Sequence, residues 1–186
     1  DWSGADLTLA DGDTLTGVFT NVARFEVPAG TTVSSVPGSA LEVYANEVLI
    51  AGTLSATGGG YEGGDSGESG APGMGPGAGG GASWGEAGAG GAFGGNGGSS
   101  IFCYTYYGVC SGPQAAGGVS YHHLVEPLGS GGGGGASHYA PLASLGGAGG
   151  GAIVLVAATV SILGTVEADG GVGGCSEDTA TVFSIG

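Results

Sequence analysis

The chain has 186 residues, of which 48 are glycine and only one is basic, and its formal net charge is −15. Such a charge makes nucleic acid and anionic membrane surfaces poor partners, because both repel acidic proteins. The length suits one domain, and a hydrophobic fraction of 41% is enough for a continuous core. We therefore expect a single domain over 1–186 whose self-repulsion weakens in salt or with divalent cations, as suits a saline or calcium-containing exterior.

The first 39 residues are typical of short β-strands joined by turns. Leu7 and Leu9 alternate with polar residues, and a turn follows at 11–13. Asp11 and Asp13 flank a glycine there, and paired carboxylates of this kind suit calcium. The rest of an ion-binding loop is missing, so we expect a solvated turn without a cofactor and keep calcium as the alternative.

The stretch at 40–59 recurs at 152–171 and aligns with it without a gap. The matching positions fall on alternate residues, namely 41 and 43, 48 and 50, and 54 and 56, with their counterparts in the second copy. A period of two that occurs three times in about twenty residues predicts three short strands, which make one coil of a parallel β-helix. We expect an all-β fold, a small parallel β-helix (solenoid), with coils at 1–59 and 152–186 and with Val48 and Val160 facing the interior.

Glycine occupies eleven of the fourteen positions taken at every third residue from 58 to 97, the exceptions being Tyr61, Pro76 and Ala82. This phase holds Gly58, Gly64, Gly67, Gly70, Gly73, Gly79, Gly85, Gly88, Gly91, Gly94 and Gly97. A period of three is that of the polyproline-II helix, which makes no internal hydrogen bonds. Helices with glycine along one edge can lie side by side and bond backbone to backbone. We expect 60–151 to form an insertion of packed polyglycine-II-type helices between the two groups of coils.

An aromatic stretch interrupts the glycine tracts at 99–127. Its side chains either pack on the glycine segments or form an exposed surface for surface glycans. The candidate ligand residues are Tyr104, Tyr106, Tyr107, Tyr121 and His122.

Three cysteines suit an oxidising compartment but leave one thiol over. Cys103 and Cys110 are close enough in sequence to close a small loop by a disulfide, while Cys175 is free or pairs with a neighbouring molecule. The chain starts at Asp1 without a signal segment, as a mature secreted protein does. The longest nearly apolar run, 152–163, is too short to cross a bilayer, so we expect a secreted or cell-surface protein without membrane insertion.

The segment GGGAIVLVAATVSILGTVEADGGVGG resembles the glycine-rich β-helix segments of large secreted and surface proteins of bacteria. In those segments a strand unit ends in Gly-Thr-apolar-x-Ala-x-Gly-Gly, and both copies here carry that pattern, as GTLSATGGG and GTVEADGGVGG. The resemblance implies an extracellular architecture without catalysis and transfers no active-site residue. More loosely, the insertion resembles the polyglycine-helix bundles of phage tail-tip adhesins and of a glycine-rich antifreeze protein.

Catalysis is the first rival interpretation, since β-helices host polysaccharide lyases and hydrolases. Arg24 is the only cation that could neutralise an acidic sugar, and there is no lysine. His122 or His123 with Glu126 and His138 would make a zinc site, but adjacent residues of an extended chain point to opposite sides. We therefore expect a protein that is not an enzyme and binds no zinc.

Open coils at the two ends of a solenoid present unpaired strand edges and apolar interior. A subunit can cover these ends by stacking head to tail on its own kind, which propagates into a filament. We expect an extracellular structural subunit that forms such a homo-polymer. The residues expected at the joint are Leu7, Leu9, Val182 and Ile185. The alternatives are an adhesin or carbohydrate-binding tip and, third, an ice-binding protein with rows of threonine.

Overall fold

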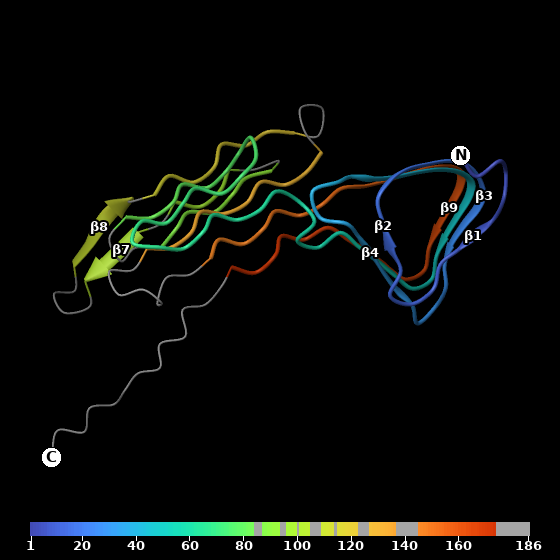
Figure 1. Cartoon of the computed structure of the whole chain (residues 1–186), viewed down its shortest axis with the longest axis horizontal. Coiled ribbons are helices and arrows are strands. Elements are labelled where there is room, and N and C mark those ends of the chain that lie inside the picture. Colours follow the sequence, from blue (N-terminus) through green and yellow to red (C-terminus); the bar gives the residue numbers. More distant parts are fainter. Residues whose placement is uncertain are drawn as a thin grey trace, which may run out of the picture.

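The computed structural model describes residues 1–83, 87–93, 96–99, 101–104, 109–113, 115–122, 127–136 and 145–173, with 101–104 and 109–113 described by their backbone alone. The described residues contain strands but no helix, so the fold is all-β as predicted. Two parallel sheets of four strands each lie at one end of the molecule, and glycine-rich segments extend from them (Figure 1).

Successive strands alternate between the two parallel sheets. The first sheet contains, in spatial order, β1 (Leu7–Thr8), β3 (Gly17–Val27), β5 (Leu41–Ile50) and β9 (Ile153–Ile162). The second sheet contains β2 (Thr14–Leu15), β4 (Thr32–Ser35), β6 (Thr53–Ser55) and β10 (Thr165–Glu167) in the same spatial order. A strand of the first sheet and the next strand of the second form one coil, and the four coils lie on top of one another. The arrangement is compatible with the predicted small β-solenoid; we call it the coil stack.

The two copies of the repeat form neighbouring coils of the stack. Leu41 pairs with Ile153 and Ile50 with Ile162 in the first sheet, and Thr53 pairs with Thr165 in the second. No residue is skipped between these pairs, so the register reproduces the gapless sequence alignment. The repeat is thus a stacking unit, although about ninety residues separate its copies along the chain.

A corner lies within each long strand of the first sheet. In β5 the buried positions are Leu41 and Val43 before the corner and Val48 and Ile50 after it, so the buried phase shifts by one residue. The two short strands predicted there are therefore one continuous, bent strand. In β3 the corner holds one additional residue, between Phe19 and Val22, which Asn21 accommodates with a φ of 55°.

The interior of the coil stack is made of aliphatic side chains and one phenylalanine. The buried cluster consists of Leu9, Leu15, Val22, Phe25, Val27, Val33, Leu41, Val43, Val48, Ile50 and Leu54. Inward-facing residues of consecutive coils are register partners, so each side chain lies on the one below it. Val48 is fully buried, as predicted, which places the core between the two sheets.

The glycine-rich segments run side by side away from the coil stack, and we call them the glycine bundle (described residues of 58–151 together with 169–173) (Figure 1). At the far end of the bundle, β7 (Ile101–Tyr104) and β8 (Val109–Pro113) form an antiparallel pair. The bundle joins the stack through backbone bonds, including Gly38 N–H to Gly59 O and Gly151 N–H to Ala56 O.

Hydrogen bonds in the bundle follow a period of three. In the segment 129–134, the amides of Gly129 and Gly132 donate to 147–150, and those of Ser130 and Gly133 donate to 89–92. The amides of the remaining pair, 131 and 134, donate to 71–74. Every third amide therefore returns to the same neighbour, whereas in a β-strand alternate residues share a side.

Many glycines of the bundle stand where a side chain has no room. A Cβ on Gly64, Gly70, Gly88 or Gly133 would lie 2.0 Å from a backbone oxygen of a neighbouring segment. Three of these glycines belong to the every-third-residue series in the sequence. Most described members of the series therefore stand where neighbouring backbones come into contact, and Gly63 and Gly81 outside the series do so as well.

Candidate assembly surface

The interior of the coil stack is open at its C-terminal end. Val160 is the register partner of the fully buried Val48, so it faces the same interior, yet it is 45% exposed. Ile162 is 52% exposed, whereas its partner Ile50 is fully buried. Val48 and Ile50 are covered by the coil that contains β9 and β10. No described strand lies beyond β9 or β10 to cover Val160 and Ile162 in the same way. The last coil therefore leaves half of an apolar layer uncovered.

The edge of this coil lacks the features that usually protect a sheet edge. Strand β9 is ten residues long and contains neither a charged residue nor a proline. Val154 and Val156, on the other face of the strand, are also exposed. Long, flat, uncharged edges of this kind pair readily with further strands. We call the exposed inner face and edge of β9 and β10 the open coil.

The N-terminal end of the stack differs in each of these respects. Strands β1 and β2 contain two residues each, and the turn at 10–13 crosses directly between the sheets. This short coil narrows the interior, so Leu9 is only 5% exposed and Leu15 only 9%. Trp2 stacks on Phe19 beside it at a centroid distance of 6.3 Å. The apolar interior is therefore closed at this end.

Of the four residues predicted at an assembly joint, two are described. Leu7 is half-buried and packs against the core, and Leu9 is buried. Val182 and Ile185 lie outside the described residues, so their part in a joint stays a prediction. Sequence reasoning missed Val160 and Ile162 as surface residues. The sequence feature that could have indicated their exposure is the run from 152 to 166, which contains no charged residue to protect a strand edge from pairing.

The carboxylates of the turn at 11–13, where calcium binding was the alternative to a solvated turn, bond to the backbone. Asp13 Oδ2 accepts a hydrogen bond from the Ala10 amide at 2.8 Å, and Asp11 Oδ1 accepts one from the Thr32 amide of the next coil, also at 2.8 Å. Gly12 between them has a φ of +84°, which favours glycine. The part of the chain that the structure describes holds no group of three or more His, Cys, Asp and Glu side chains placed to hold a metal ion.

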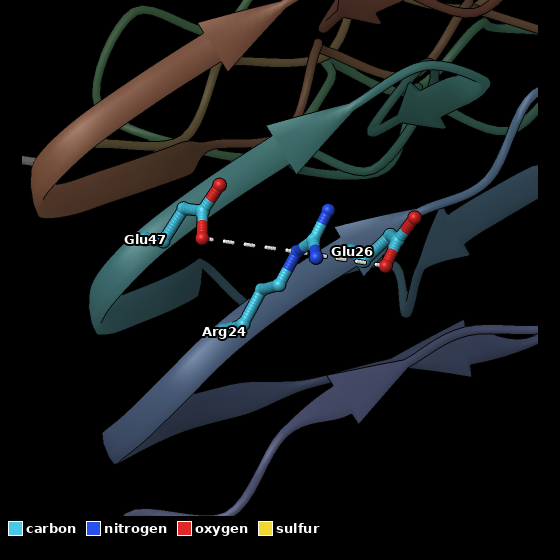
Figure 2. Close-up of polar contacts among 3 residues, drawn as sticks. All are labelled: Arg24, Glu26 and Glu47. Carbon is cyan, nitrogen blue, oxygen red and sulfur yellow. Dashed lines mark ion pairs between the residues drawn. The ribbon is translucent and has the colours of Figure 1, made fainter.

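The single basic residue lies on the outer face of the first sheet, between two carboxylates (Figure 2). Arg24 Nε is 3.6 Å from Glu26 Oε2 on its own strand and 3.9 Å from Glu47 Oε2 on β5. Both pairs are partly exposed, so each stabilises the fold only weakly. The Arg24 guanidinium offsets part of the negative charge of the two carboxylates.

Tyr121 packs into the glycine bundle. Its ring meets Phe93 edge to face at 5.3 Å, and its hydroxyl donates to the carbonyl of Leu128. Ser130 Oγ donates to the Tyr121 hydroxyl at 2.9 Å and accepts a hydrogen bond from the Gly77 amide at the same distance. Tyr121 thus fixes the chain at 121 to the bundle, while the neighbouring His122 is exposed.

Of the other candidate ligand residues, only Tyr104 is described, in the hairpin at the far end of the bundle. Tyr104 ends β7, and Tyr106 and Tyr107 lie outside the described residues. Cys103 and Cys110 are backbone register partners across this hairpin, which is the placement that the predicted disulfide requires. Cys175 also lies outside the described residues.

No protein-family model matches the chain, and neither a curated protein nor a solved structure matches it. Over the described residues, the structure contains no helix of the length and hydrophobicity that crossing a bilayer requires.

Proposed function

We propose that the protein is a non-catalytic, extracellular structural subunit that assembles head to tail into a filament. The observation that supports this most is the open coil, where Val160 and Ile162 leave an apolar layer half exposed. Burial of such a layer is favourable by about 25 cal/mol for each Å² removed from water. In both sheets the stack begins with a short strand, β1 or β2, and ends with β9 or β10. A second copy placed beyond β9 and β10 therefore continues both sheets in the same direction.

The negative charge of the subunit should make filament assembly depend on ionic strength. Each subunit has a formal net charge of −15, and the first coil carries Asp6, Asp11 and Asp13. Joining two copies brings these charges closer together, which opposes assembly at low salt. Salt screens this repulsion without weakening the burial of apolar surface. Polymer length should therefore increase with salt concentration.

The test compares two lysine substitutions by light scattering and negative-stain electron microscopy. Val160→Lys places a charge in the open coil and should yield monomers at concentrations at which the unchanged protein forms filaments. Val18→Lys is the matched control, because Val18 is 57% exposed but lies on the inner strand β3 beside Glu42. This control should assemble normally. An unchanged protein that stays monomeric at high salt, or that stops at a closed dimer, would contradict the filament.

We propose in addition that the glycine bundle consists of polyglycine-II-type helices and acts as a stiff arm. The period-three bonding of 129–134 and the absence of room for Cβ atoms support this assignment. Polyproline-II geometry has φ near about −75° and ψ near about +145°. Backbone angles from NMR chemical shifts should fall there for 129–134. Angles typical of a β-strand would overturn the assignment.

An adhesin or carbohydrate-binding tip is the second candidate, and the position of the hairpin favours it. Strands β7 and β8 lie at the end of the bundle that is remote from the coil stack, where a tip would contact a surface (Figure 1). A glycan array with the unchanged protein and with Tyr104→Ala and Tyr106→Ala separates the two candidates. Glycan binding by a strict monomer, lost in these variants, would favour the adhesin over the filament.

A further inference from the structure

The central segment of the glycine bundle, 129–134, is surrounded by five described segments. It donates backbone hydrogen bonds to 147–150, 71–74 and 89–92, and it accepts them from 60–64 and 79–82. Consecutive segments around it also bond to one another, from 147–150 through 60–64, 71–74 and 79–82 to 89–92. The five neighbours fill five of six positions around the central segment. In order around it, neighbours that accept its hydrogen bonds alternate with neighbours that donate hydrogen bonds to it.

The sixth direction lies between 89–92 and 147–150, which make no hydrogen bond to each other in the described part of the chain. The alternation requires this side of the central segment to accept hydrogen bonds. The carbonyl oxygens of Ser130 and Gly133 are the ones that accept none from any described residue. Ser130 O lies against Gly91, where a Cβ would approach it to 2.2 Å. This free acceptor thus lies at the wall that 89–92 forms.

A groove of about 350 Å³ occupies the sixth side. Its lining residues come from the segments 90–93, 129–132, 147–150 and 170–173. The amides of Gly91, Gly147 and Gly150 line it and donate to no other described residue. Among the described residues that line the groove, none has a charged side chain. Its recognition groups are backbone donors on both flanks and a backbone acceptor at the base.

We propose that this groove binds an extended, glycine-rich segment of another polypeptide chain, which adds a sixth neighbour to the central segment. Such a ligand carries one donor and one acceptor per residue, and with three residues per turn its amides would face the free carbonyls of the central segment at every third position. A β-strand repeats every two residues and would lose this match.

Steric contact explains why the ligand must be rich in glycine. The segments already around the centre approach so closely that a Cβ on Gly70, Gly88 or Gly149 would lie 2.0 Å from an oxygen of the central segment. A sixth neighbour at the same separation has no room for side chains on the faces that contact the walls. Its outward positions can hold any residue.

Residues 1–186 leave no glycine tract over to fill the groove, so we assign the ligand to another chain. Its long tracts already bond to one another within the bundle. The longest stretches outside the described residues are SHYAPLAS at 137–144, without glycine, and 174–186, whose two glycines stand at its ends. Neither offers glycine at every third position.

Binding is tested by NMR on the full-length, isotopically labelled protein with the peptide GSGGGGGA, which copies 129–136. We expect saturable shifts and slower hydrogen exchange at the amides of Gly91, Gly147 and Gly150. A control peptide, GSVGGVGA, carries valine at two positions three residues apart and should bind at least about tenfold more weakly, a loss of about 1.4 kcal/mol. No change at these amides, or equal binding of both peptides, would overturn the proposal.

A pair of variants localises the binding. At Gly170, which lines the groove, a Cβ would lie 3.3 Å from Ala148 O, so Gly170→Leu needs only a small shift of the neighbouring backbone and adds bulk at the groove wall. Binding should fall by about tenfold or more. Gly98→Leu is the matched control, because a Cβ there meets nothing within 4 Å and Gly98 lies outside the groove. Equal affinity of both variants for the peptide would place the binding elsewhere and refute the groove.

Discussion

The coil stack and the glycine bundle are stabilised by different interactions. In the stack, side chains such as Phe25, Leu41 and Ile50 fill an interior between two sheets, and the strand backbones bond to neighbouring strands of the same sheet. In the bundle, the backbone of the central segment bonds to five neighbouring segments, and its tightest contacts leave no room for a Cβ. One region is held together by apolar burial and the other by backbone hydrogen bonds.

This difference teaches which kind of residue each region can tolerate. A solenoid coil needs volume at its inward positions, because a missing methyl group leaves a cavity. A bundle of extended segments needs the absence of volume, because one added methyl group separates two backbones. The same alanine substitution should thus be harmful in the two regions for opposite physical reasons. The predictions below test this contrast, from the largest expected effect to the smallest.

The largest effect is expected from shortening a side chain inside the coil stack. Ile50→Ala should lower the free energy of unfolding by about 2–5 kcal/mol, because Ile50 is fully buried. Ile162→Ala is the matched control from the same position of the repeat and should cost less than about 1.5 kcal/mol, since Ile162 is 52% exposed. Urea unfolding followed by circular dichroism measures both. Equal losses would mean that the open coil is covered.

A smaller but still large effect is expected from adding a methyl group to the bundle. Gly133→Ala places a Cβ 2.0 Å from Gly80 O and should cost about 1–3 kcal/mol. Gly98→Ala meets nothing within 4 Å and should leave the stability nearly unchanged. Hydrogen exchange of the bundle amides, read separately from those of the stack, shows where each loss occurs. A tolerated Gly133→Ala would refute contact between the backbones.

Charge on the outer face of the stack should matter less than either kind of packing. Arg24→Met keeps the aliphatic stem and leaves Glu26 and Glu47 without a cation, which should cost at most about 1 kcal/mol at low salt. The cost should shrink at high salt, because the pairs are partly exposed and screened. Thermal unfolding at two salt concentrations measures it. A large loss that persists at high salt would indicate packing rather than charge.

The smallest effect concerns a phenol on the same face. Tyr44 donates a hydrogen bond of 2.9 Å to Glu42 Oε2, and this bond, together with the negative charge of Glu42, raises the pKa of Tyr44. The linked stability is present at neutral pH and is lost as the pH rises above the usual pKa of tyrosine. Glu42→Gln should lower the pKa of Tyr44, measured by ultraviolet absorbance titration. An unchanged titration curve would contradict the assigned cause.

The sequence could predict the stacking unit because inward positions must be apolar. The pairs Leu41 and Ile153, and Ile50 and Ile162, match in the sequence and are partners in the structure. The every-third-residue glycines could be recognised for the converse reason, since Gly64 and Gly70 stand where no Cβ fits. In both cases a local steric demand selects the residue type and so leaves a period in the sequence.

The features that escaped prediction depend on what lies next to a residue in space. Val48 and Val160 are the same residue at the same position of the repeat, and only the presence of a further coil makes one buried and the other exposed. The choice of partners within the bundle is equally hidden, because glycine carries no side chain to specify a neighbour. The sequence also suggested two equivalent ends, whereas the short first coil closes one of them over Leu9.

The position of β9 has a consequence for how the chain folds. About ninety residues of glycine-rich chain separate β6 from β9. Before β9 and β10 reach the stack, β5 and β6 form its open edge, and β9 and β10 add to them only afterwards. Loop closure of this length is thermodynamically tolerable, since each doubling costs only about 0.6 kcal/mol, but contacts so distant in sequence slow folding. The first three coils can form from local contacts and then serve as a template. A pulse-labelling experiment should therefore find the amides of β3 and β5 protected well before those of β9.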